Sequence, residues 1–273
     1  MTRTLLSFMK RKNLIFLYPR RLVALPLFGL FKRAGQALHS ADTTVLATAL
    51  GPIAQSAYRR TFGTAAFVSV MNVIFGGLLA WALVRYDFPG KGWLDAAIDL
   101  PFSLPTSVAG LTLLSVYNDQ SGVLGSSLAS RGIRVVFSPI AVAIARAFVS
   151  FPFSVRTVQP VLQELEPELE EAALSLGATD WGVFQHVIWP AIRPALRTGG
   201  ALGFARAVGE FGSVVRVASN LPLRDLVAPV LVFQSLEQYD TAAASLIGAI
   251  RLLISLARLF IINSLASVRF GRA

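Results

Sequence analysis

Cysteine is absent from this chain of 273 residues, and histidine occurs only twice, at His39 and His186. Without cysteine the protein can form no disulfide, thiolate metal site or cysteine nucleophile. Neither histidine has neighbours at metal-ligand spacing, so we expect surface or solvated side chains and no metal site. The sequence also lacks GxxxxGK[ST], which predicts that this chain binds no nucleotide and no other cofactor.

Acidic residues are few: 15 Asp and Glu stand against 25 Lys and Arg, for a formal net charge of +10. A basic balance can indicate nucleic acid, but these residues are spread along the chain and form no recognised nucleic-acid-binding motif. An excess of Lys and Arg is also typical of the cytoplasmic loops of membrane proteins. We therefore expect membrane lipid, and no nucleic acid, among the partners.

Apolar residues are abundant, at 54% of the chain, with a mean hydropathy of +0.61. A soluble domain of this length is less apolar. The pattern predicts an all-α polytopic membrane protein whose basic flanks, 1–13 and 266–273, are cytoplasmic. About six transmembrane helices are expected within 14–265, near residues 14–31, 62–84, 98–117, 135–155, 198–219 and 241–265.

Glycines in one of these spans and prolines in another predict how the two helices pack. In the span 62–84, Gly63, Gly76 and Gly77 would allow close approach of neighbouring helices. The span 98–117 contains two prolines four residues apart. Their unpaired backbone carbonyls require neighbouring helices or a wet cavity, so this helix is expected to face the interior.

Several expected spans contain arginines within otherwise apolar stretches: Arg20, Arg216, Arg251 and Arg258. An arginine near a helix centre costs roughly 2.5–3.5 kcal/mol on insertion scales. Arg258 could snorkel toward the cytoplasmic end, whereas Arg251 would need an interior partner or water. In the fifth span Arg206 and Glu210 have i,i+4 spacing, which permits an ion pair. These arginines also leave open the possibility that this chain is an altered copy that does not insert fully into the membrane.

One polar segment, residues 164–190, lies between the fourth and fifth expected spans and is rich in acidic residues: Glu164, Glu166, Glu168, Glu170, Glu171 and Asp180. Its position predicts a cytoplasmic helical segment, and its charge predicts a basic surface on a soluble partner. A solvated or docking face explains these carboxylates better than paired catalytic groups do. No catalytic residue is therefore expected.

Residues in this segment have the spacing of the EAA loop of ABC-transporter permease subunits: Glu171, Ala172, Ala173, Gly177, Val187 and Pro190. Trp189 stands where that family usually has leucine. The chain is identified as a member of this family. The stretches 84–91, 99–106, 155–162 and 209–212 resemble the sulfate/thiosulfate permeases of the CysT (CysU) type, and molybdate permeases, which share a related core, are the alternative.

The resemblance implies a type I ABC importer permease fold and three kinds of partner subunit. These are a second permease of the CysW type, two cytoplasmic ATPases of the CysA type that hydrolyse ATP, and an external sulfate/thiosulfate-binding protein. It places the chain in a bacterial inner membrane, with the chloroplast envelope as the alternative. The other open classes are an ATP-independent channel or secondary transporter, which leaves the EAA spacing unexplained, and a membrane enzyme, which lacks a reactive constellation.

The resemblance also implies roles for the EAA residues, because this loop folds as two short helices that dock in a cleft of the ATPase. Gly177 would lie at the bend, where glycine accepts a positive φ. Glu171 would make a polar contact with the ATPase, Ala172 and Ala173 would permit close approach, and Pro190 would end the segment.

An anion path needs hydrogen-bond donors and a positive field. Ser103, Thr106 and Ser107, beside the prolines of the third span, and Arg206 in the fifth are the candidates. Ser and Thr often only bond to carbonyls of their own or neighbouring helices, and a pair with Glu210 would equally explain Arg206. Both interpretations stay open for each residue.

Overall fold

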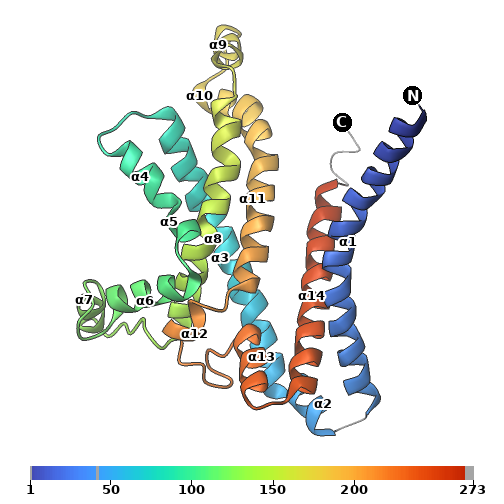
Figure 1. Cartoon of the computed structure of the whole chain (residues 1–273). Helices are drawn as coiled ribbons and strands as arrows, with labels where there is room; N and C mark the ends of the chain where they lie inside the picture. The colour runs from blue at the N-terminus through green and yellow to red at the C-terminus, as the bar shows by residue number, and fades with distance from the viewer. Residues whose placement is uncertain (1, 41–42, 268–273) are drawn as a thin grey trace.

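The computed structural model describes residues 2–40 and 43–267, with side chains for residues 21–40, 43–258 and Phe260. These residues form helices joined by turns, with no strand among them, as an all-α protein requires (Figure 1). In chain order the helices are α1 (Thr2–His39), α2 (Thr43–Leu50), α3 (Pro52–Arg85), α4 (Lys91–Ile98), α5 (Leu100–Ser103), α6 (Thr106–Tyr117), α7 (Gly125–Ala129), α8 (Pro139–Gln163), α9 (Pro167–Ser175), α10 (Asp180–Val183), the π-helix η1 (Phe184–Ile188), α11 (Trp189–Gly209), α12 (Val214–Val217), α13 (Ala228–Glu237) and α14 (Thr241–Ser267).

The centre of the molecule is a bundle of the three long helices α3, α8 and α11, which pack along one another (Figure 1). Glycines permit this close packing: a Cβ atom at Gly76 would lie 2.8 Å from Ser154 Cβ, and one at Gly77 would lie 2.9 Å from Leu196 Cδ2. Gly63, in contrast, has no heavy atom within 4 Å of its Cβ position, so the expected contact at Gly63 is wrong. Of these three glycines, only the two in the C-terminal half of α3 therefore allow close approach.

Polar side chains tie this bundle together inside its apolar surroundings. Ser69 Oγ on α3 donates to the carbonyl oxygen of Gly200 on α11 at 2.7 Å. Asn72 Nδ2, also on α3, donates to Ser150 Oγ on α8 at 2.9 Å and to Ala147 O at 3.1 Å. Interhelical hydrogen bonds of this kind stabilise helix packing where hydrophobicity cannot distinguish protein from lipid.

Helices α1 and α14 lie side by side and stand apart from the bundle over much of their length (Figure 1). α1 runs without a break to His39, so the expected tail 1–13 and first span 14–31 form one helix. The interval from residue 32 to residue 60, between the first two expected spans, contains the end of α1, all of α2 and the start of α3. α3 begins at Pro52 because proline is well suited to a first helical position. The expected tail 266–273 lies largely outside the described residues.

The expected third span, 98–117, is not one helix. It is divided into the end of α4, α5 and α6, with Leu104 in an extended conformation at φ −88° and ψ 132°. Pro105 explains the break, because the residue before a proline is disfavoured in the α region. The interval 85–97, between the second and third expected spans, contains most of α4.

The expected fifth span is also broken. α11 ends at Gly209, Glu210 is extended with ψ 124°, and the short helix α12 follows after a turn. Arg216 is consequently an exposed residue of α12 and no part of a long helix.

Among the described residues, three helical stretches are long and apolar enough to cross a membrane: Thr43–Arg85, Pro139–Gln163 and Thr241–Arg258. α11 has 21 residues but carries several arginines. The remaining crossings of the expected six stay predictions.

Candidate functional site

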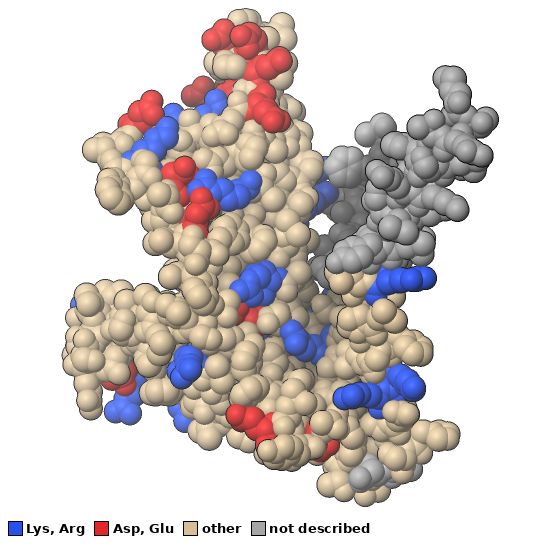
Figure 2. Space-filling model, viewed as in Figure 1, with Lys and Arg blue, Asp and Glu red and all other residues tan. Residues whose placement is uncertain are grey.

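The segment 164–190, hereafter the coupling segment, extends beyond the end of the three-helix bundle, where α9 and α10 form a tip (Figure 1). Acidic side chains gather at this tip (Figure 2). The exposed ones include Glu164, Glu166, Glu168, Glu171 and Asp180. The tip therefore offers a negatively charged surface to anything that approaches along the bundle axis.

Gly177 forms the bend between α9 and α10, with φ at +88°. Its N–H donates to Leu174 O at 2.9 Å, and the N–H of Ala178 donates to Ala173 O at 3.0 Å, which closes the end of α9. Thr179 then caps α10, its Oγ1 accepting from the N–H of Gly182 at 3.2 Å. Two short helices with Gly177 at the bend are thus what the structure contains, and the left-handed backbone is the reason for glycine there.

Large apolar side chains stand in water around this bend. Leu176 is 89% exposed and Trp181 is 67% exposed. Exposed apolar groups rimmed by charge are typical of protein docking sites. Sequence reasoning missed both residues, although a leucine directly before the bend glycine in an otherwise polar segment was a usable signal.

The inner side of the coupling segment is anchored to the bundle. Glu170 of α9 forms an ion pair with Arg85, the last residue of α3. Trp181 stacks on Phe184 with ring centroids 5.3 Å apart, and Phe184 packs edge-on against Trp81 of α3 at 6.0 Å. Displacement of the tip would therefore be passed to α3.

The predicted EAA residues differ in their surroundings. Glu171 and Ala172 are exposed, whereas Ala173 is half-buried and packs against the apolar cluster at the end of the bundle. Pro190 ends no helix: it lies in the first turn of α11, and the helical backbone continues from Asp180 to Gly209. The π-helix η1 makes this continuity possible, because the N–H of Trp189 bonds to Phe184 O, five residues back.

A second polar site lies deep in the bundle, at the end of α11. Glu210 is 1% exposed, and its Oε2 lies 2.7 Å from Arg206 Nη1. Its Oε1 accepts from the N–H of Ser213 at 2.9 Å and from Ser213 Oγ at 2.7 Å. The expected ion pair is present, but Glu210 reaches it from the turn after the helix and not from the helix itself.

Two further arginines, Arg146 and Arg251, lie near this site. Arg146 of α8 is completely buried, donates to Thr61 O and Thr64 Oγ1, and has no partner for its Nε and Nη2 atoms. Arg251 of α14 donates to Val208 O at 2.9 Å, which supplies the interior partner that its position required. Arg258 does not snorkel toward the cytoplasmic end, since its guanidinium lies 4.6 Å from the centre of the buried Phe62 ring.

The remaining candidates for an anion path are only partly brought together. Thr106, at the start of α6, lies against the Glu210 turn, because a Cβ atom at Gly212 would be 2.2 Å from Thr106 Oγ1. Ser103 and Ser107 are exposed, and no hydrogen bond joins either described side chain to Arg206. Of the three hydroxyls, Thr106 is therefore the one that borders the buried site.

Arg156 of α8 connects the bundle to α4 and α5, which sequence reasoning did not predict. Its Nε and Nη2 donate to the two carboxylate oxygens of Asp99 at 2.9 and 2.7 Å, and its Nη1 donates to Asp95 Oδ1 at 2.6 Å. A signal existed, since Asp99 and Arg156 fall in two of the four stretches that carry the family resemblance.

These features define a helical membrane protein with an acidic coupling segment at one end and, inside the bundle, the buried Arg146 and Glu210 beside the half-buried Arg206 and Arg251. The family described as binding-protein-dependent transport system inner membrane component matches residues 72–269. The chain belongs to this family.

Relatives and solved structures extend this assignment. The probable sulfate transport system permease protein cysT of Chlorokybus atmophyticus is 54% identical over 247 residues, covering 90% of this chain and 85% of that protein. The sulfate transport system permease protein CysT of a Synechocystis species is 57% identical over 214 residues, covering 78% and 74%. A bacterial ABC transporter involved in the import of the acidic polysaccharide alginate superposes with a TM-score of 0.76 at 15% identity, over 97% of this chain and 98% of that one. The fold is the type I ABC importer permease fold.

Proposed function

We propose that this chain is the transmembrane permease subunit of an ATP-driven sulfate importer. Its similarity to sulfate permeases over most of their length supports sulfate as the transported anion. The observation that carries the transport mechanism is the coupling segment: an acidic tip with exposed Leu176 and Trp181, bent at Gly177. Such a tip can dock in a cleft of a cytoplasmic ATPase that presents basic and apolar groups.

In this proposal, ATP-driven closure of the ATPase pair moves the tip, and the bundle follows. The helical rod from Asp180 to Gly209 leads directly to Glu210, and the Arg85–Glu170 ion pair adds a second connection through α3. A rigid-body switch of this kind alternates access to a path between two states. Arg206 and Thr106 border the site where an anion would meet donors and positive charge.

The complete importer would contain a second permease, two ATPases that bind and hydrolyse ATP, and an external binding protein that delivers sulfate. This chain would supply half of the path and one coupling segment. We place the complex in a bacterial inner membrane, with the chloroplast envelope as the alternative.

The test compares two glycines with the same backbone geometry. Gly177 and Gly132 both have positive φ, at +88° and +79°, and neither has an atom within 4 Å of its Cβ position. A β-branched residue is strained at positive φ, so valine at either position distorts only its own turn. We expect Gly177→Val to lose the ATPase in detergent pull-down of the assembled complex, while Gly132→Val retains it.

Uptake measurements in vesicles complete this test. Sulfate uptake should require ATP, fail in Gly177→Val and persist in Gly132→Val. Equal ATPase retention by both variants would contradict the coupling role. ATP-dependent uptake of molybdate without sulfate would contradict the substrate assignment and leave the coupling role intact.

A further inference from the structure

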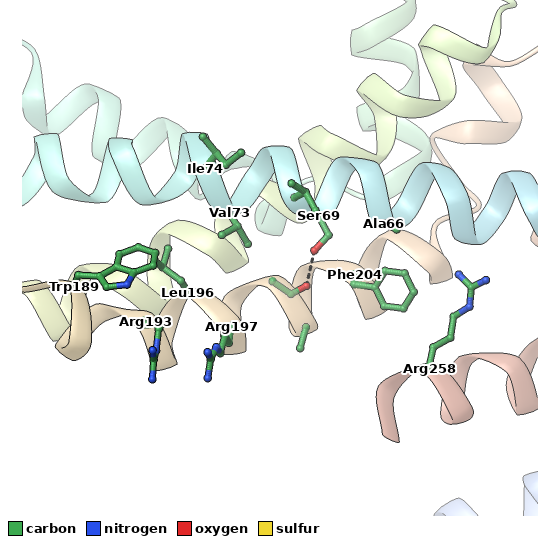
Figure 3. Close-up of a pocket in the computed structure, with 13 residues that line it drawn as sticks. Ala66, Ser69, Val73, Ile74, Trp189, Arg193, Leu196, Arg197, Phe204 and Arg258 are labelled. Carbon is green, nitrogen blue, oxygen red and sulfur yellow. Dashed lines mark hydrogen bonds between the residues drawn. The ribbon is translucent and has the colours of Figure 1, made fainter. Parts of the chain in front are cut away.

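A groove of about 750 Å³ opens between α3 and α11 and extends to α14 (Figure 3). Its walls are mainly apolar, formed by Val70, Val73 and Ile74 of α3 and by Leu196 and Phe204 of α11. Val70 and Ile74 are 54% and 48% exposed, so the apolar wall continues onto the outer face of α3. A hydrocarbon chain could therefore enter the groove from the surrounding membrane.

Two arginines of α11 line the same groove without a counter-charge. Arg193 and Arg197 are one turn apart and project from one side of α11 (Figure 3). No carboxylate of the described chain forms a salt bridge with either of them, and Arg193 Nε and Arg197 Nη1 are shielded from solvent without a hydrogen-bond partner. Shielded guanidinium donors without a partner are costly, and an anion with several oxygens would satisfy them.

The groove's chemistry separates two sources of such an anion. A free sulfate ion would give up hydration against apolar walls, which is costly for a dianion. A phospholipid would place its phosphate on the arginines and its acyl chain along the walls. Trp189, near the end of the coupling segment, lines one end of the groove, where an aromatic ring suits the membrane interface (Figure 3).

We propose that this groove binds an anionic phospholipid, with its phosphate on Arg193 and Arg197 and an acyl chain against Val70 and Ile74. Basic pockets between transmembrane helices on the cytoplasmic side are suited to such headgroups. Arg258 contributes less, because it lies farther along the groove over the Phe62 ring. The bound lipid would brace α3 against α11 next to the coupling segment. The proposal does not depend on which anion the importer carries.

The experiment measures lipid binding to the full chain in its assembled complex. Native mass spectrometry would compare phosphatidylglycerol with phosphatidylcholine on wild type, the double variant Arg193→Gln/Arg197→Gln, and the control Arg131→Gln/Arg224→Gln. The control arginines are exposed and lie outside the groove. We expect wild type and control to prefer phosphatidylglycerol, and the double variant to bind it at least roughly tenfold more weakly.

A second variant tests the apolar wall without changing any charge. Ala66 is an exposed lining residue of α3, so Ala66→Trp should fill the groove and also reduce phosphatidylglycerol binding. Co-purification of the ATPase shows that each variant is assembled. Unchanged lipid preference in the assembled double variant would overturn the proposal, as would full competition by inorganic sulfate. Absence of any headgroup preference in wild type, as expected if a helix of the second permease fills the groove, would overturn it too.

Discussion

Glu210 is a buried carboxylate that combines an ion pair with two hydrogen bonds. It is the buried carboxylate among Arg206, Arg146 and Arg251, and it also accepts two hydrogen bonds from Ser213. Removing one partner from a buried charge network leaves the others uncompensated, which costs more than the pair contributes when intact. The same carboxylate holds the turn that ends α11.

Glu210→Gln should therefore destabilise the protein, by about 3 kcal/mol if the usual cost of breaking a buried pair applies. Glutamine can still accept from Ser213 but cannot neutralise Arg206. The measurement is thermal unfolding of the purified protein in detergent, with the exposed Glu237→Gln as the matched control. The double variant Arg206→Gln/Glu210→Gln should recover part of the lost stability. Equal stability of Glu210→Gln and the control Glu237→Gln would contradict the role given to Glu210.

Leu176 contrasts with the buried, charged Glu210 because it is an apolar side chain exposed to solvent. Leu176→Ala should weaken ATPase binding by about 1–2 kcal/mol, because truncating a docked apolar anchor typically costs this much. The folded subunit alone should be unchanged, since the side chain is 89% exposed. Binding titrations with purified ATPase would measure the effect, and Leu221→Ala, at an exposed leucine beyond α12, provides the control. Equal affinity of both variants would remove Leu176 from the interface.

At the scale of elements, Arg156 acts as a clamp between α8 and the α4–α5 pair. The guanidinium meets Asp99 with two nitrogens and Asp95 with a third contact. Such a planar fork fixes orientation as well as distance, which an ammonium group does not. Because α5 is only four residues long, we expect its position to depend on this clamp.

Arg156→Lys should accordingly loosen α4 and α5 although the charge is kept. Hydrogen exchange in residues 91–103 should become faster, while exchange in the centre of α3 stays the same. Arg134→Lys is the matched control, because Arg134 makes a single longer contact of 3.7 Å with Asp119 at the surface. Unchanged protection of α5 in Arg156→Lys would show that packing alone positions it.

The rod formed by α10, η1 and α11 is the second element-scale feature. Gln185 and His186 are exposed residues of η1, so their replacement removes no buried side chain. Gln185→Gly/His186→Gly should make the rod flexible at a cost of about 0.5–1 kcal/mol per glycine relative to alanine. We expect the ATPase to bind and hydrolyse ATP while sulfate uptake falls, and the control Gln185→Ala/His186→Ala to transport normally. Normal uptake by the glycine variant would assign coupling to the α3 connection.

At the scale of the whole molecule, the sequence predicted those features that depend on residues close together along the chain. The bend at Gly177 was implied by the family resemblance that the spacing within one segment carries, and the membrane architecture followed from composition. The Arg156 clamp did not, because its carboxylates lie 57 and 61 residues away along the chain. The hydropathy pattern could not predict where α5 and α11 end, since apolar residues continue on both sides of each break. Pro105 did signal the first break, whereas Glu210 looked like an ordinary i,i+4 partner.

The π-helix η1 determines where a single residue could be deleted without changing the orientation of α11. A π turn holds one more residue than the α-helical turn around it, and each residue of an α-helix advances the chain by about 100°. Deleting one residue within Phe184–Ile188 would convert η1 to α-helix and leave the facing of α11 unaltered. The same deletion after Trp189 would rotate every later side chain of α11, Arg206 included, by that angle. Between the acidic tip and the three-helix bundle, the chain thus contains a π turn at which a one-residue deletion would leave the facing of α11 unchanged.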